Sequence, residues 1–352
     1  MTQTAAPSTP AETPATGNAR LRRILRTVAI VSCTPYLSLK IAWIAGSHIG
    51  IPEGSSLLEH RTGMAVANSI TVLMDGAVIV IALLLTRPWG LRVPAWLLAF
   101  PMWVATGLLA PIMAGFPLQL AVKALGGSTN HGSGREPFLD EWVFGVVYSG
   151  FIVQGLALGA LFVLYARDRW GHLWRGRVWE LPVGAIGAAM GVPPARAKPR
   201  AWGRATAVAA ALLALFPLTT HLLWACGATA GLSEGRVADR TSDFYVLEAM
   251  YVGFLVAAVA GGWLLAFRRG AVLPVKVPLA LAWVGSGAVA CWGGWLSLAS
   301  LGGVDDIADR PTQLMNLAYA GQMIVGILVA TVGAYFFAER SAGRPQASQR
   351  SA

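Results

Sequence analysis

Residues 26–46 read RTVAIVSCTPYLSLKIAWIAG, a long apolar run with one charged residue, Lys40, in its interior. A helix needs about 20 such residues to cross the roughly 30 Å hydrocarbon core of a bilayer. The run is too long for the apolar core of a signal peptide, and no clear cleavage site follows it. It therefore predicts a membrane-spanning helix that carries an ionisable group.

The composition of the whole chain indicates many such spans. Of its 352 residues, 55% are hydrophobic and only 12% are charged, and the mean hydropathy is +0.58. Soluble globular proteins carry about 25% charged residues. The apolar runs are long, unlike the short alternating strands of a membrane barrel, so we expect an all-α integral membrane protein. Eight transmembrane helices are predicted, at about 26–47, 65–86, 93–114, 141–166, 205–227, 244–267, 277–301 and 313–338.

The charged residues between these spans predict their orientation. Of the 27 Lys and Arg residues, 20 lie in segments on one side of the membrane and only six on the other, where most Asp and Glu residues are found. By the positive-inside rule the basic side is cytoplasmic, so we expect both termini in the cytoplasm and the protein in the cell membrane. The rule also explains the net charge of +10. We therefore expect membrane lipids, and no nucleic acid, as partners of the basic segments.

A basic, proline-containing cytoplasmic linker at 171–203 divides the chain. The first four spans lie within 20–170 and the last four within 204–339. Residues 1–19 and 340–352 contain no apolar run, so both are expected to be disordered tails.

The two halves carry similar marks in the same order. In the first and fifth spans a proline precedes a basic residue and then a tryptophan, namely Pro35, Lys40, Trp43 and Pro217, His221, Trp224. Similar outer loops follow, GIPEG at 50–54 and GLSEG at 231–235, and the fourth and eighth spans contain YSG at 148–150 and YAG at 319–321. Four spans per half give both halves the same orientation. The marks therefore predict two parallel four-helix repeats.

Two charged residues are predicted to lie deep in adjacent spans. Lys40 is about 14 residues from the inner start of the first span, and Asp75 is about ten residues from the outer start of the second. At a rise of 1.5 Å per residue, both fall in the middle-to-outer part of the bilayer. Charges at this depth usually face the protein interior and find a partner. We expect a Lys40–Asp75 ion pair, which either only joins two helices or belongs to a functional site.

Other polar and aromatic residues share helix faces with these charges or lie at a similar depth. The candidate substrate-binding residues are Lys40, Asp75, His221, Tyr36, Asn68, Thr71, Trp43 and Trp224. We expect them to line one polar seam between the halves. Gln154 and Gln322 are further candidates to point inward, whereas Glu248, near the outer end of the sixth span, is expected at the membrane interface.

Three functions fit these features. A transporter or permease-like protein would receive a small molecule or lipid at the polar site, because transporter sites lie near the bilayer midplane. A membrane-embedded enzyme would act on an isoprenoid or quinone-type substrate, with Asp75 as a proton donor and an aromatic pocket of Trp43, Trp103, Trp224, Trp292 and Trp295. A non-catalytic membrane subunit or sensor would bind a partner through faces of small residues.

Motifs for cofactors and metals are absent from the sequence. It contains no P-loop and no HExxH, and only His221 of the five histidines lies deep in a predicted span. We expect no cofactor and no metal. The cysteines Cys33, Cys226 and Cys291 form no CxxC motif and are expected to be packed thiols.

Three short runs resemble a family of known sequences. PYLSLKIAW at 35–43, GIPEG at 50–54 and TVLMD at 71–75 are similar to a group of uncharacterised multi-span membrane proteins of actinobacteria such as streptomycetes. The resemblance implies a multi-span membrane protein from an actinobacterial source. It implies no activity and no catalytic residues.

Overall fold

The structure is a computed structural model that describes residues 15–59, 61–127, 139–180, 201–238, 240–269, 272–301 and 310–342. Within these residues the chain is all-α, and eight helical stretches of 24–33 residues are long and apolar enough to cross a membrane. The predicted number of spans is therefore confirmed. Most of both predicted tails and residues 181–200 of the predicted linker lie outside the described residues.

The helices follow one another along the chain with short connections. They are α1 (Ala15–Val31), α2 (Thr34–Ile44), α3 (Ser56–Glu59), α4 (Arg61–Leu84), η1 (Pro88–Arg92), α5 (Ala95–Ala124), α6 (Glu141–Trp170), η3 (Gly171–Leu173), α8 (Ala201–Ala225), α9 (Glu234–Ala238), α10 (Ser242–Phe267), α11 (Lys276–Leu301) and α12 (Gln313–Ala342). α1 begins within the predicted tail and joins α2 to make the first span.

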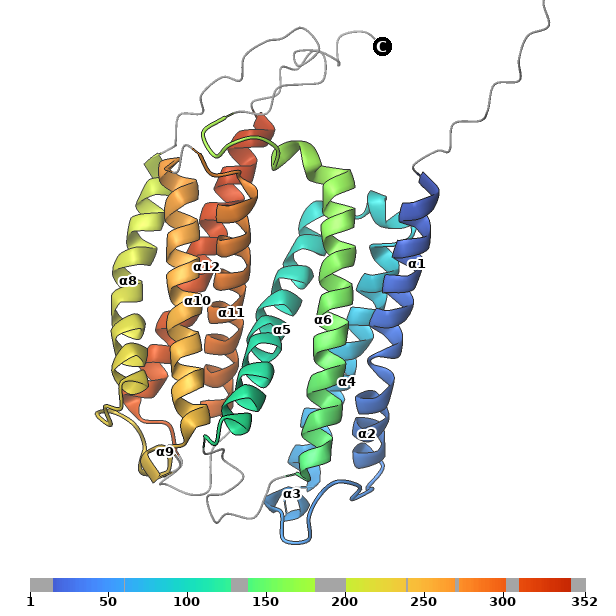
Figure 1. Cartoon of the computed structure of the whole chain (residues 1–352), viewed down its shortest axis with the longest axis vertical. Helices are drawn as coiled ribbons and strands as arrows, with labels where there is room; N and C mark the ends of the chain where they lie inside the picture. The colour runs from blue at the N-terminus through green and yellow to red at the C-terminus, as the bar shows by residue number, and fades with distance from the viewer. Residues whose placement is uncertain are drawn as a thin grey trace, which may run out of the picture.

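The long helices form two groups (Figure 1). The first half contains α1, α2, α4, α5 and α6, and the second contains α8, α10, α11 and α12. In the second half, α10 and α12 each pack against both α8 and α11. In the first half, α6 packs on α1 and α5, and α2 packs on α4. α5 links the halves because it also packs on α11 and α10, and α1 begins at the end of the bundle where α12 ends.

The halves meet most closely where α5 crosses α11. A Cβ atom added to Gly107 of α5 would lie 2.3 Å from the carbonyl oxygen of Gly287 of α11. Real Cβ atoms do not approach a backbone oxygen so closely. Glycine at position 107 therefore allows the two backbones to touch.

Two tryptophans form hydrogen bonds across this crossing. The indole N–H of Trp103 on α5 donates to Oγ of Ser286 on α11 at 2.9 Å. The indole N–H of Trp283 on α11 donates to Oγ1 of Thr106 on α5 at 3.2 Å. The two bonds are reciprocal: each helix provides one tryptophan donor and one hydroxyl acceptor.

The first span is interrupted between α1 and α2. Pro35 lies in the first turn of α2. Proline has no N–H to continue the helix, and its ring would clash with the carbonyl four residues earlier. Gly150 of α6 packs against this break: a Cβ there would lie 3.0 Å from the Ser32 carbonyl oxygen and 2.8 Å from the Tyr36 ring. The break and the glycine together bring Tyr36 against α6.

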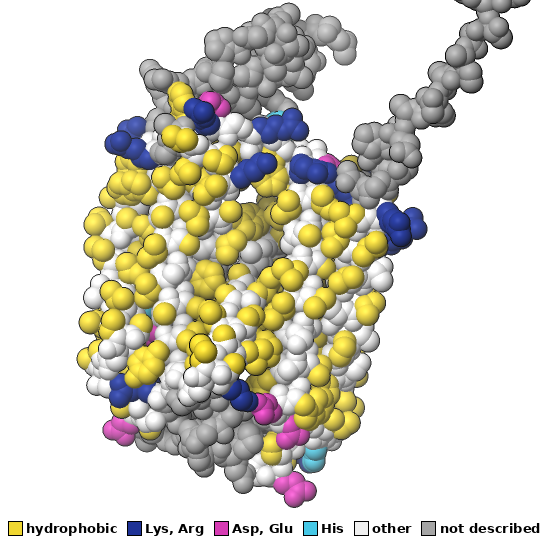
Figure 2. Space-filling view, in the orientation of Figure 1, with side chains coloured by type: hydrophobic (Ala, Val, Ile, Leu, Met, Phe, Trp, Pro, Cys, Tyr) yellow, Lys and Arg dark blue, Asp and Glu magenta, His cyan; other side chains and the backbone are white. Residues whose placement is uncertain are grey.

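Side chains are sorted along the bundle (Figure 2). Lys and Arg side chains gather at the end where α1 begins and α12 ends, which we call the basic end. Hydrophobic side chains cover the middle, as a bilayer requires, and Asp and Glu side chains gather at the opposite end. This distribution agrees with the one that the loop sequences predict.

Candidate functional site

The predicted ion pair between Lys40 and Asp75 is present inside the first half. Nζ of Lys40 on α2 lies 2.8 Å from Oδ2 of Asp75 on α4, and the two side chains are only 10% and 8% exposed. The ammonium also lies 4.9 Å from the ring centroid of Tyr36 and 5.6 Å from that of Phe151. An aromatic face attracts a cation, most strongly where water is excluded. The charge is therefore held by one carboxylate and two rings.

A chain of hydrogen bonds extends from this pair toward α6. The Tyr36 hydroxyl lies 2.8 Å from Oε1 of Gln154 and 3.3 Å from Oδ1 of Asp75, so it can donate to either oxygen. Nε2 of Gln154 donates to Sγ of Cys33 at 2.8 Å. All these groups are buried. We call Cys33, Tyr36, Lys40, Asp75 and Gln154 the Lys40 cluster.

A second buried polar cluster lies in the other half. Nδ1 of His221 on α8 is 2.5 Å from Oε2 of Glu248 on α10, and Nε2 of His221 is hydrogen-bonded to Nε2 of Gln322 on α12. His221 and Gln322 are fully buried and Glu248 is 5% exposed. The ring of Tyr251 lies 4.8 Å from the imidazole. We call His221, Glu248, Tyr251 and Gln322 the His221 cluster.

The placement of Glu248 corrects the sequence prediction, which put this residue at the membrane interface. Glu248 lies only six residues into α10, near the end of the span, and its depth alone suggested exposure. The carboxylate is instead buried because it pairs with His221. The first half of the sequence could have predicted this pair. Lys40, which matches His221, pairs with an acid of the next span, so His221 could be expected to do the same.

Four of the predicted binding residues lie outside these bonding networks. Asn68 and Thr71 bond to carbonyls of their own helix, Nδ2 of Asn68 to Met64 at 2.9 Å and Oγ1 of Thr71 to Asn68 at 2.9 Å. Trp43 and Trp224 donate to the loops that follow their helices, as described below. His221 does not join Lys40 and Asp75, because its partners all belong to the second half. The structure thus has two polar clusters where one seam was expected.

The loops after Trp43 and Trp224 have the same internal bonds. The indole N–H of Trp43 donates to the carbonyl of Ile49 at 2.8 Å, and that of Trp224 donates to the carbonyl of Ala230 at 3.0 Å, each six residues on. The chain reverses with positive φ at Gly46 (91°) and Gly50 (72°) in the first loop. It does so again at Gly227 (97°) and Gly231 (78°) in the second. A positive φ favours glycine because it has no Cβ.

The two clusters are suited to holding charge and exchanging protons. Each has a basic group, a carboxylate and a glutamine amide whose oxygen and nitrogen can exchange places by rotation. Among the described residues, no group of three or more His, Cys, Asp or Glu side chains could hold a metal ion.

Comparisons of the chain with protein-family models, with curated proteins and with solved structures give no match. They identify no family, so the resemblance to actinobacterial membrane proteins stays a prediction.

Proposed function

We propose that the protein is a transporter-like membrane protein made of two parallel four-helix repeats. The basic end would face the cytoplasm, with both termini there, because Lys and Arg are retained on that side of the cell membrane. A small polar or ionisable molecule, or a lipid, would be the substrate.

The contacts between α5 and α11 support the repeat. Trp103 and Trp283, Thr106 and Ser286, and Gly107 and Gly287 each differ by 180 in residue number. A two-fold axis makes residue i of one half contact residue j of the other while j contacts i. Such an axis through the glycine contact, along the membrane normal, accounts for all three pairs and is the arrangement of parallel transporter repeats.

The observation that carries the proposal is that each half buries a basic side chain, a carboxylate and a glutamine amide. Lys40 and His221 differ by 181 in residue number, as Trp43 and Trp224 do, and each contacts an acid from the next span. Ionisable groups inside a membrane are costly and mark substrate paths or proton relays by default. In this chain the cost is incurred once in each half, and the basic members, Lys40 and His221, occupy matching positions.

The His221 cluster suggests how a proton could be handled. If the amide nitrogen of Gln322 donates to Nε2 of His221, Nε2 is the acceptor and Nδ1–H of the ring donates to Glu248. If His221 takes up a proton, both ring nitrogens become donors, and the Gln322 amide must rotate so that its oxygen accepts. Oε1 of Gln322 has no hydrogen-bond partner among the described residues, so this rotation breaks no bond of that oxygen. Protonation would thus be coupled to a local rearrangement between α8, α10 and α12.

The test separates a transport role from a purely structural one. Removing one partner of a buried ion pair can unfold a protein, but replacing both by apolar residues of similar size is often neutral. We expect the double variant Lys40→Met with Asp75→Leu to fold and to lose substrate-driven current in proteoliposomes across a panel of metabolites. Lys123→Gln, at an exposed pair with Glu141, is the matched control and keeps the current. A folded double variant with the wild-type current would overturn the proposal.

The enzyme hypothesis has less support from the geometry. Its aromatic pocket would need several tryptophans around one space, but four of the five donate to four different acceptors and the fifth is exposed. Trp103 donates to Ser286, Trp292 donates to the carbonyl of Leu108 at 3.2 Å, and Trp295 is 47% exposed. These tryptophans pack helices together or lie at the surface. No specific contact favours the subunit or sensor hypothesis over transport.

A further inference from the structure

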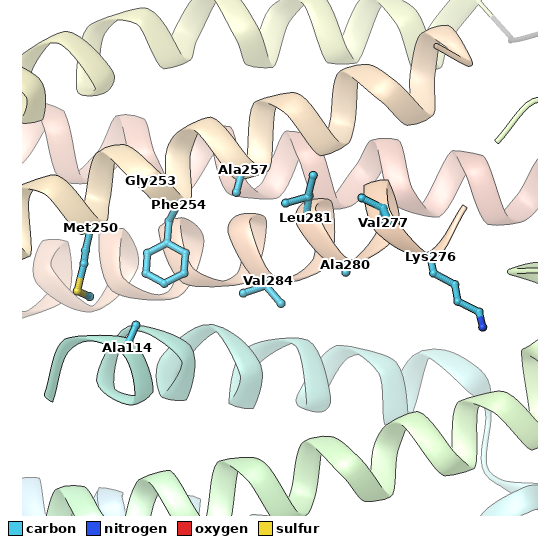
Figure 3. A pocket seen from close by; sticks show the side chains of 10 residues that line it. All are labelled: Ala114, Met250, Gly253, Phe254, Ala257, Lys276, Val277, Ala280, Leu281 and Val284. Carbon is cyan, nitrogen blue, oxygen red and sulfur yellow. The ribbon is translucent and has the colours of Figure 1, made fainter. Parts of the chain in front are cut away.

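An apolar groove of about 640 Å³ separates α5 from α10 and α11 (Figure 3). Ala114 of α5 lines one wall, and the opposite wall consists of Met250, Gly253, Phe254, Ala257, Val277, Ala280, Leu281 and Val284, with Lys276 at one end. Gly253 and Ala280 are exposed, so the groove is open to the surrounding membrane. Its size is in the range of small-molecule sites, about 300–1,000 Å³.

The groove has one closed end and one open end. At the closed end, a Cβ on Gly115 of α5 would lie 3.3 Å from Cε of Met250, so α5 and α10 touch there. At the other end α11 begins with Lys276, at the basic end of the bundle. Figure 3 shows the Lys276 side chain pointing away from the groove lining, past its end and toward the side where α5 lies.

The length of the groove matches an acyl chain. At 1.5 Å per residue, Met250 to Ala257 covers about 10 Å of α10, and Lys276 to Val284 covers about 12 Å of α11. Counted from the basic end, the α11 stretch ends at the level where the α10 stretch begins, because Gly285 packs against Ala258. Together they span roughly 22 Å, more than half of the roughly 30 Å hydrocarbon core.

The ammonium of Lys276 is available for a ligand. In the part of the chain that the structure describes, it has no hydrogen-bond or ion-pair partner. The carboxylates at this end already have partners: Asp168 pairs with Arg22, Glu339 pairs with Arg268, and Glu180 accepts from the backbone N–H of Arg177. An unpaired cation at the membrane surface, above an apolar groove, is complementary to an anionic headgroup above an acyl chain.

We propose that this groove binds an anionic membrane lipid from the leaflet at the basic end. One acyl chain lies along α10 and α11, and the phosphate pairs with Lys276. The lipid fills the space that α5 leaves open between the halves. The inference goes beyond the proposed transport function and uses none of the residues of the two polar clusters.

Two substitutions test the two parts of the site separately. Lys276→Gln removes the charge and leaves the groove open. Gly253→Leu fills the groove, and it can be accommodated because a Cβ at Gly253 has no atom within 4 Å. Gly333→Leu is the matched control, since Gly333 on α12 has equally open space but does not line the groove. Lys123→Gln, at the other end of α5, controls for loss of a lysine.

The measurement is native mass spectrometry of the purified full chain with dioleoyl phosphatidylglycerol or dioleoyl phosphatidylcholine, which have the same acyl chains. We expect the wild type to retain the phosphatidylglycerol about fivefold better, the value of one lysine near a membrane surface. Lys276→Gln should abolish the preference, and Gly253→Leu should reduce retention of both lipids, while both controls behave as wild type. Ala280→Leu fills the groove from α11 and replaces Gly253→Leu if that variant unfolds.

Three results would each overturn the proposal. They are equal retention of the two lipids by the wild type, an unchanged preference in Lys276→Gln, and wild-type retention by a folded groove-filling variant. Lipid retention is measured without transport, so failure here leaves the proposed function standing, and loss of transport in the cluster variants leaves the lipid site standing.

Discussion

At the scale of single residues, the Lys40–Asp75 pair raises the question of how much a buried charge contributes to stability. Desolvation of two charges offsets most of their attraction, so an intact pair contributes little, whereas a lone buried charge is strongly destabilising. We expect Asp75→Ala to lower the free energy of unfolding by about 3–5 kcal/mol, because it leaves the Lys40 ammonium without its carboxylate. Lys40→Met with Asp75→Leu should restore most of that loss. Unfolding in mixed detergent micelles measures both.

The control for the Lys40 and Asp75 variants is an ion pair at the protein surface. Lys123 and Glu141 form a pair in which the side chains are 52% and 67% exposed. Exposed pairs contribute about 0–1 kcal/mol, so Lys123→Ala should change stability by no more than that. A loss at Asp75→Ala as small as the loss at Lys123→Ala would show that water reaches the Lys40 cluster.

The two matched tryptophans give a second prediction at this scale. Trp43→Phe and Trp224→Phe each remove one indole N–H that donates to a loop carbonyl, while an aromatic ring remains in place. We expect each to lower the free energy of unfolding by about 1 kcal/mol. Trp96→Phe should have no effect, because Trp96 is 67% exposed. Unequal losses at positions 43 and 224 would argue against equivalent loops.

The polar site could be predicted from the sequence only in part. Lys40 and Asp75 are conspicuous because charged residues are rare inside apolar runs, and their depths nearly coincide. The burial of Glu248 was not predicted, because the position of a residue along a helix does not determine whether it is buried. Glu248 is buried by its contact with His221 on a different helix. Asn68 and Thr71 share a face with Asp75, but short polar side chains in a helix can bond to their own backbone, and these do.

At the scale of helices, the α5–α11 crossing determines how the halves fit together. We expect Gly107→Ala to lower the free energy of unfolding by about 1–3 kcal/mol, the usual effect of overpacking, because its methyl group would collide with the Gly287 carbonyl. Gly159→Ala on α6 is the control: no atom lies within 4 Å of its added Cβ, so it should be within about 1 kcal/mol of wild type. If both alanines were equally tolerated, the helices would not cross as closely as described.

The helices themselves were largely predictable, and their breaks and contacts were not. Apolar length alone indicates eight spans, because each must cover the same bilayer thickness. The break after Val31 depends on a proline, but Pro101, Pro111 and Pro117 lie within α5 without ending it. A proline alone therefore does not decide where a helix is interrupted, and the close packing of Gly150 of α6 on this break cannot be read from the sequence.

At the scale of the whole molecule, the arrangement of charge and the proposed repeat make one joint prediction about topology. Leu91 and Val272 lie in the turns that precede α5 and α11 at the basic end, 55% and 84% exposed. Leu125 and Leu301 lie at the other ends of α5 and α11, 87% and 81% exposed. The proposed orientation places the first two in the cytoplasm and the last two outside the cell, in the same sense for both halves.

Single cysteines at these four positions test this prediction in a chain whose native Cys33, Cys226 and Cys291 are replaced by serine or alanine. A membrane-impermeant maleimide should label Leu125→Cys and Leu301→Cys on intact cells, and Leu91→Cys and Val272→Cys only after permeabilisation. Labelling of all four in the reverse pattern would invert the orientation and place the basic end outside. Different labelling of Leu91→Cys and Val272→Cys would be incompatible with a parallel repeat, because a two-fold axis along the membrane normal keeps equivalent turns on one side.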